Sequence, residues 1–177
     1  TTDTFHFQIK EVIESTFIDN EGRQTLRMER YRRTDESQPW VIFKVWSANL
    51  TSISAEKKED NIIYVKLVFP VLSNKKWNGN VKNDLGNQEY QYASVNSPVS
   101  FNSFSFDSAL TVLQNDFDDA ITAKDYEIEK YAAGIGMFFK ESYTGVYKFP
   151  LPSNTITLED SLDEYIHYTE KIISFKN

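Results

Sequence analysis

The sequence predicts a mainly β protein, an antiparallel barrel or sandwich of about 8–10 strands with one or two short helices. Apolar and polar residues alternate with a period of two in several segments, as at Ile63, Val65, Leu67 and Phe69. These segments are rich in β-branched and aromatic residues, which suit a pleated, half-buried surface. Clusters of Asn, Asp, Gly and Pro, which form turns, separate one segment from the next.

The expected strands follow one another along the chain, each bounded by a turn signal. Asp19–Gly22 predicts a tight hairpin between the first two strands, because Asn and Gly tolerate positive φ. Thr34–Pro39 separates the second strand from the third, and Ser52–Asn61 is interpreted as a polar connector. A long loop begins at Ser73 and continues through Asn87. The strands are expected at 5–18, 23–33, 40–49, 61–70, 88–95, 108–115, 125–133, 135–147 and 164–175.

The two helix candidates are short. One is expected at about 115–124, beginning at Asn115, and the other at about 157–163, where Thr157 and Asp160 have the spacing of a capping box. Pro150, Pro152 and Asn154 break the chain before the second of these helices. No internal repeat or convincing domain boundary interrupts the pattern, so residues 1–177 are expected to form a single β-rich domain.

The composition is that of a globular protein and excludes several classes of function. The 177 residues are 40% hydrophobic and 15% aromatic, which is enough for a sizeable core. A net charge of −7 argues against nucleic acid as a partner and against passive adsorption to anionic membranes. The absence of cysteine excludes disulfides, thiolate nucleophiles, zinc–thiolate sites and iron–sulfur clusters. No apolar run approaches the length needed to span a bilayer.

Three segments resemble those of a known family. The run Tyr131–Glu141 (YAAGIGMFFKE) resembles the Tyr-Ala-x-Gly-Ile-Gly signature of uncharacterised lipoproteins from Gram-negative, Bacteroidetes-type cell envelopes. Met28–Arg32 and Trp77–Asn80 resemble further elements of that family. The resemblance implies a β-rich fold, a removed signal peptide and a lipidated Cys preceding Thr1. It implies anchoring to the outer membrane, on its periplasmic or surface face, and no assigned reaction. Met137–Phe139 replaces the smaller aliphatic residues expected there.

Gly134 and Gly136 lie inside a run that otherwise favours a strand. Glycine weakens a strand interior, so its expected use is a sharp bend or bulge, or a place where an aromatic ring lies on the backbone. Tyr131, Phe138 and Phe139 are the candidate rings. A ligand site with a glycine floor is the alternative, but the spacing does not match a dinucleotide-binding fingerprint.

All five arginines of the chain lie between Arg23 and Arg33. On a strand, Arg27 and Arg33 share one face with Tyr31, whereas Arg30 and Arg32 share the other. Arginine suits planar recognition of carboxylate or phosphate, so Arg27, Tyr31 and Arg33 are candidates for an anion or acidic-sugar site. The alternative is that the arginines pair with the protein's own acidic residues and discourage association between sheet edges.

Trp77, Asn78 and Asn80 are further candidate ligand-binding residues, since they lie in the long loop and an exposed Trp stacks well on sugars. The alternative is a Trp that closes the end of the core and pins the loop. His6 and His167 would meet only if the first and last strands paired to close a barrel. The carboxylates of segment 115–125 have a calcium-type composition, but a solvated loop or helix start is the favoured interpretation.

These observations favour a non-catalytic envelope lipoprotein that binds a small molecule, glycan or lipid, with no cofactor or metal and as a monomer. A structural or accessory protein that contacts other envelope components is the alternative. A hydrolase of envelope polymers ranks third. With 26 acidic residues in the chain, some pair of carboxylates will always look suitable for hydrolysis, so such a pair has almost no specificity as a signal.

Overall fold

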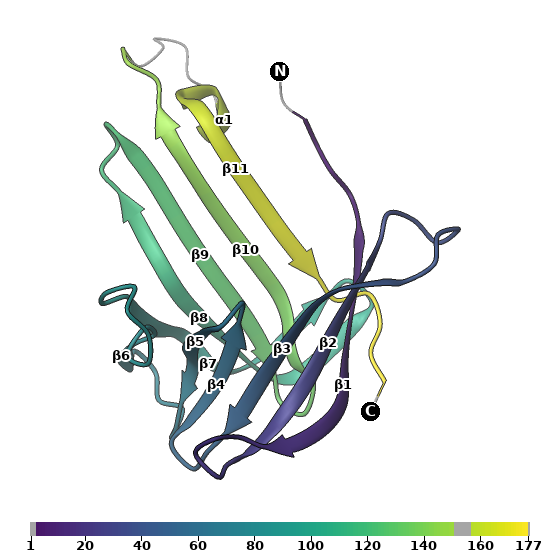
Figure 1. The fold of residues 1–177 in the computed structure, drawn as a ribbon. Helices are drawn as coiled ribbons and strands as arrows, with labels where there is room; N and C mark the ends of the chain where they lie inside the picture. The colour runs from purple at the N-terminus through teal and green to yellow at the C-terminus, as the bar shows by residue number, and fades with distance from the viewer. Residues whose placement is uncertain (1–2, 151–156, 177) are drawn as a thin grey trace. The chain divides into compact units, whose positions relative to one another are not determined.

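A computed structural model describes residues 3–150 and 157–176 and shows two antiparallel sheets and one short helix (Figure 1). The prediction of a mainly β, antiparallel protein is therefore confirmed. The chain divides into two compact units, Thr1–Pro70 with Asn80–Gly86, and Val71–Gly79 with Asn87–Asn177. The expectation of a single domain stays a prediction. The one helix in the described ranges is far too short to cross a membrane.

The first unit contains a five-stranded sheet in which each strand pairs with the next along the chain. The first hairpin turns at Asp19–Gly22 as predicted, with Gly22 at φ 76°. The strand Ser54–Glu59 was not expected, because its charged sequence suggests a connector. Its carboxylates pair with lysine and arginine of the same unit, Glu59 with Lys66 of the neighbouring β5 and Glu56 with Arg23 just before β2, and these ion pairs stabilise a polar strand here. The strands are β1 (Gln8–Ile18), β2 (Gln24–Arg33), β3 (Val41–Leu50), β4 (Ser54–Glu59) and β5 (Ile62–Val68).

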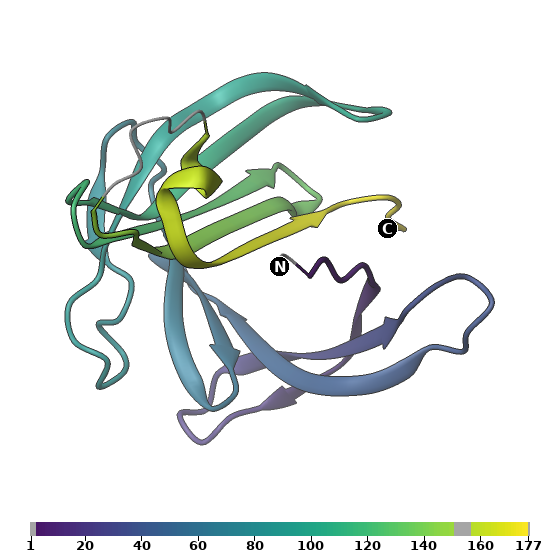
Figure 2. The ribbon, with the colours of Figure 1, turned by 90° about the horizontal axis from the view of Figure 1, so that it is seen from above.

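The second unit contains a six-stranded sheet in the order β11-β10-β9-β8-β7-β6. The pairing of β7 with β8 shifts register at several places, and the long hairpin bends along its length (Figure 2). Neither sheet closes on itself within the described ranges, so the closed-barrel alternative is wrong. The elements are β6 (Lys76–Asn78), β7 (Glu89–Phe101), β8 (Phe104–Asp118), β9 (Ala123–Ala132), β10 (Gly136–Tyr147), α1 (Leu158–Ser161) and β11 (Leu162–Lys171).

One of the two helix predictions is wrong. Residues 115–124 form the end of β8, a tight turn and the start of β9. The Asp119 carboxylate accepts the backbone N–H groups of Ile121, Thr122 and Ala123, so it stabilises a turn instead of a helix start. The helix at Thr157 does form, as α1, and its N-terminus carries the predicted capping box with Asp160.

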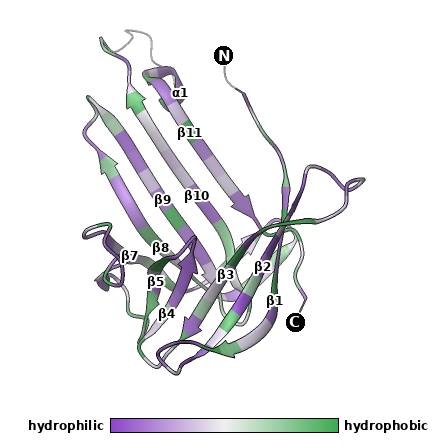
Figure 3. Ribbon diagram, viewed as in Figure 1, coloured by the Kyte–Doolittle hydropathy of each residue, from purple (hydrophilic) through white to green (hydrophobic). Residues whose placement is uncertain are grey.

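One buried cluster of the second unit is rich in aromatic residues and lies at one end of its sheet. Its innermost residues come from three neighbouring strands, along which hydrophobic and hydrophilic residues are interspersed (Figure 3). They are Phe106, Ala109, Ala132 and Phe138, with Val99, Phe101, Phe104, Ile135, Phe139 and Ile172 packed around them. This cluster forms the base on which the candidate site is built.

Gly134 lies in the turn between β9 and β10, and Gly136 is the first residue of β10, paired with Ala132 of β9. Their φ angles of 76° and 99° are in the region that favours glycine, so they allow the tight turn. A Cβ added at either position would meet no atom within 4 Å. No ring lies on these glycines, therefore, although the strand that follows does carry a bulge between Met137 and Phe139.

Candidate functional site

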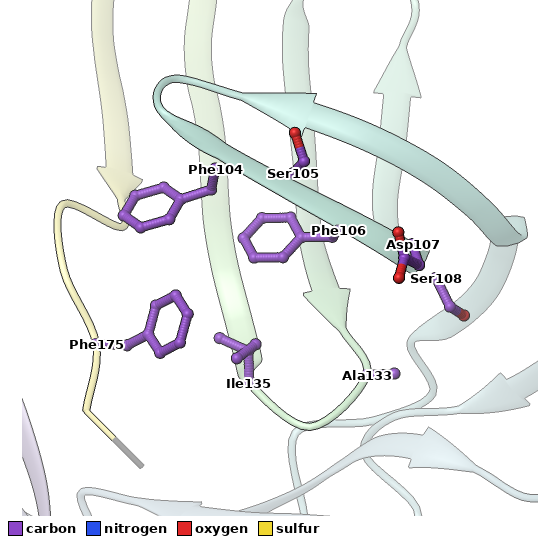
Figure 4. Close-up of a pocket in the computed structure, with 8 residues that line it drawn as sticks. All are labelled: Phe104, Ser105, Phe106, Asp107, Ser108, Ala133, Ile135 and Phe175. Atoms are coloured by element: carbon purple, nitrogen blue, oxygen red, sulfur yellow. The ribbon is translucent and has the colours of Figure 1, made fainter.

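A recess of about 360 Å³ opens in the second unit, at the aromatic end of its sheet (Figure 4). Three segments that are far apart in the sequence meet there: the start of β8, the β9–β10 turn and the chain after β11. The residues that line it are Phe104, Ser105, Phe106, Asp107, Ser108, Ala133, Ile135 and Phe175.

Phe104 and Phe106 form the inner wall of the recess. They lie two residues apart on β8, so both point to the same face of the strand. Their rings stack with centroids 6.1 Å apart and an interplanar angle of 10°. Phe106 is buried and packs against Phe138 of β10 at 4.7 Å, which ties this wall to the core. The inner wall is therefore preformed by packing of the sheet.

Phe175 and Ile135 form the outer wall (Figure 4). The Phe175 ring lies 5.6 Å from that of Phe104 and remains 42% exposed. Phe175 follows the end of β11, and the last backbone hydrogen bond before it runs from Ile172 N–H to the Phe138 carbonyl at 2.9 Å. The sheet thus holds the start of this segment, whereas side-chain packing holds Phe175.

The rim of the recess is polar. Ser105 and Asp107 alternate with the two phenylalanines of β8 and are exposed, and Ser108 Oγ donates to Asn96 Oδ1 at 3.3 Å. An apolar wall with a few polar groups at its rim suits a ligand with an apolar body and a polar end. Across residues 3–150 and 157–176, no group of three His, Asp or Glu is arranged to hold a metal ion.

Trp77, Asn78 and Asn80 do not line this recess. The Trp77 ring packs against Tyr90 and Tyr92, with centroid distances of 5.9 Å and 4.7 Å. Asn78 Oδ1 accepts the Gln88 N–H at 3.0 Å. This is the geometry of the alternative in which Trp77 pins the loop.

Asn80 belongs to the first unit, where it is buried. Its carbonyl accepts the backbone N–H of Asn83 at 3.0 Å, and its Oδ1 accepts from Asn83 Nδ2 at 3.2 Å. The Asn83 amide also donates to the Ile63 carbonyl of β5 at 2.8 Å. Asn80 therefore helps to hold segment 80–86 onto the five-stranded sheet.

Arg27, Tyr31 and Arg33 share one face of β2, as the alternation predicts. Arg27 and Tyr31 both donate hydrogen bonds to the Glu29 carboxylate. These bonds hold the Glu29 pKa below its usual range, and the bond from Tyr31 has the larger effect. Arg33 Nε donates to the side chain of Gln8 at 2.6 Å. Its guanidinium also lies 4.4 Å from the Trp40 ring centroid.

The remaining arginines have similar surroundings. Arg23 pairs with Asp19 at 2.9 Å and with the buried Glu56 at 3.0 Å, and Arg30 lies 4.0 Å from the Trp46 ring centroid. Each of these contacts lies within the first unit. Arg23, Arg27 and Arg30 thus pair with the protein's own carboxylates, as in the alternative of internal pairing. Arg32 and Arg33 instead lie against the rings of Phe43 and Trp40.

A second polar cluster crosses β9, β10 and β11. Tyr126, Tyr143 and His167 are register partners on these three strands, and His167 Nε2 lies 2.9 Å from the Glu141 carboxylate. Burial, above all, raises the pKa of Tyr143 to about 12. In the described sheets β1 pairs only with β2 and β11 only with β10, so the closure that would bring His6 to His167 does not form.

Sequence reasoning missed the residues of the recess. The available signal was the run Phe101-Asn-Ser-Phe104-Ser-Phe106, in which three aromatic residues crowd a hairpin tip. Nothing local connects that tip with Ile135 or Phe175, because those residues reach the recess through strand pairing.

The fold is that of a mainly β protein of two antiparallel sheets, with a phenylalanine-lined recess in the second unit. No protein-family model, curated protein or solved structure matches the chain. The likeness to envelope lipoproteins therefore rests on the sequence motifs alone.

Proposed function

We propose that this chain is a non-catalytic binding module of the cell envelope that holds the apolar part of a small molecule, glycan or lipid in the phenylalanine-lined recess. The preformed wall of Phe104 and Phe106 carries the proposal. A volume of about 360 Å³ lies within the range of small-molecule sites. The envelope location, with a lipid anchor preceding Thr1, is proposed from the resemblance of the Tyr131–Glu141 segment.

Native mass spectrometry of freshly purified protein, prepared without detergent or organic solvent, tests the proposal. A ligand in the recess should appear as an added mass that is lost on denaturation. Because Phe175 is 42% exposed, Phe175→Ala removes one wall of the recess with little loss of core packing. We expect it to reduce the fraction of ligand-bound protein several-fold.

Phe117→Ala is the matched control. Phe117 is 51% exposed on β8 but lies at the other end of that strand and does not line the recess. The two variants should show the same unfolding midpoint, so that a difference in bound mass reports on the recess. Equal retention of the ligand in both would place the bound molecule elsewhere and contradict the proposal.

An accessory protein that contacts other envelope components is the second candidate. The observation that favours it is the edge strand β1, which exposes Ile13, Phe17 and Ile18. β1 carries a bulge between Ile13 and Ser15 and the charged residue Lys10. Both features commonly protect an edge strand from nonspecific pairing with the strands of other chains. Loss of partner capture in Ile13→Lys, with no change in Phe175→Ala, would favour this function over ligand binding.

A further inference from the structure

Several lysines of the second unit have polar partners in the described ranges. Lys148 donates to the Asp160 carbonyl, and three others pair with carboxylates. The pairs are Lys76 with Glu89 at 2.6 Å, Lys124 with Asp118 at 2.8 Å and Lys140 with Glu127 at 2.5 Å.

Lys130, Lys171 and Lys176 differ, because no carboxylate in the described ranges lies within ion-pair distance of any of them. Lys130 and Lys171 are the register partners of Phe139 on its two sides. The Lys130 ammonium lies 5.0 Å from the Phe139 ring centroid. Phe139 packs against the same aromatic cluster as the recess, and Lys176 directly follows its outer wall residue Phe175.

These positions give the aromatic end a local positive charge in a protein of net charge −7. An ammonium with no internal counter-ion retains its capacity to attract an anion, whereas a paired one has lost most of it. Among the described residues that line the recess, Asp107 carries the one carboxylate. An acyl chain on the phenylalanine walls would leave its head group at the rim, within reach of flexible lysine side chains.

We infer that the ligand of the recess is an anionic amphiphile, with its hydrocarbon part on Phe104, Phe106 and Phe175 and its carboxylate or phosphate held by Lys130, Lys171 and Lys176. This inference rests on the proposed function and adds the chemical class of the ligand. A free fatty acid and the anionic lipid of a membrane share this chemistry, and the experiment separates them.

Three monomeric probes with the same dodecyl chain and different head groups test the inference: dodecanoate, dodecyl maltoside and dodecyltrimethylammonium. Binding is measured by calorimetry at neutral pH and below the micellar concentration of each probe. We expect dodecanoate to bind about tenfold more tightly than the neutral probe, since three exposed charge contacts together correspond to about that factor. The preference should shrink at high salt.

The variant Lys130→Gln/Lys171→Gln/Lys176→Gln should lose that tenfold preference and keep its affinity for dodecyl maltoside. Its matched control, Lys10→Gln/Lys58→Gln/Lys76→Gln, makes the same change in net charge at lysines of β1, β4 and β6 and should behave as the unmodified protein. Circular dichroism checks that both fold.

The outcomes are distinct. Equal affinity for all three head groups, or a preference for the cationic probe, overturns the inference and leaves the proposed function standing. No binding of any dodecyl probe, together with no binding to vesicles, overturns both. Binding to vesicles that contain phosphatidylglycerol, but not to phosphatidylcholine vesicles or to dodecanoate, supports the inference with a membrane lipid as the source.

Discussion

The ring of Tyr90 lies directly on the backbone of Gly79: a Cβ added at this glycine would come within 2.4 Å of the ring carbons. Tyr90 is 4% exposed and packs edge-on against Trp77 with a centroid distance of 5.9 Å. The glycine of the Trp77–Asn80 segment therefore has a packing role, because any side chain at position 79 would displace the tyrosine ring.

Gly79→Ala should lower the free energy of unfolding by about 1–3 kcal/mol, the usual cost of overpacking a filled site. Urea unfolding measures the change. Near-UV circular dichroism should also change, because moving Tyr90 alters the surroundings of Trp77. In Gly86→Ala, where the added Cβ meets no atom within 4 Å, only the positive φ is penalised and the aromatic signal should persist.

Glu56→Gln should destabilise the protein far more than Glu21→Gln, although both carboxylates pair with Arg23. The Glu56 side chain is 3% exposed and also holds Lys82 at 2.7 Å, whereas that of Glu21 is 65% exposed. Breaking a buried ion pair leaves charges without compensation, so we expect a loss of about 2–3 kcal/mol for Glu56→Gln. An exposed pair contributes little, and Glu21→Gln should cost less than about 0.5 kcal/mol. Similar losses in the two variants would contradict the role of burial.

The stability of the fold should decrease as the pH falls from about 4 to about 2. The Asp19 pKa is lowered to about 2, first by the backbone N–H of Arg23 and then by the Arg23 side chain and the Glu21 N–H. Because the folded pKa lies below the unfolded one, the stabilisation is complete above the unfolded value and is lost as Asp19 becomes protonated. Chemical unfolding across this pH range should show a shallower decrease for Asp19→Asn. Asp84→Asn, which removes an exposed carboxylate outside this turn, should keep the original slope.

Tyr143→Phe should leave stability unchanged or raise it by up to about 1 kcal/mol. The Tyr143 hydroxyl is buried and has no hydrogen-bond partner within the described ranges. Burying it costs free energy that no hydrogen bond offsets, and the variant without the hydroxyl avoids this cost. Burial also raises the Tyr143 pKa to about 12. The contribution of this pKa shift to the free energy of unfolding is complete below the unfolded pKa of about 10, and it is lost as the pH rises toward 12.

Absorbance of the phenolate during a titration to high pH measures this tyrosine directly. The late-titrating component should be missing from Tyr143→Phe and present in Tyr168→Phe, which lies one residue past the His167 partner of Tyr143 on β11. A late component that persists in Tyr143→Phe would assign it to another tyrosine.

Particular residues show where sequence reasoning succeeded. The turn at Asp19–Gly22 and the capping box at Thr157 were predicted because each depends on a few adjacent residues with strong backbone preferences. The division of the arginines of β2 between two faces followed from the two-residue period of a strand. The helix expected at 115–124 was wrong because Asp, a residue type that often begins helices, also stabilises tight turns, as Asp119 does.

The candidate site shows where such reasoning stopped. Sequence reasoning expected an aromatic ring on the backbone of Gly134 or Gly136, whereas the structure has it on Gly79. It also selected Trp77 and the arginines, whose side chains engage residues of their own units. The amino-acid pattern alone is sufficient for the β class, the main turns and the charge, because period, propensity and composition are local quantities. Pairing between distant strands is what brings Phe104, Ile135 and Phe175 together and leaves Lys130 and Lys171 on either side of Phe139. That pairing depends on the packing of the whole sheet, so the recess exists only in the folded chain.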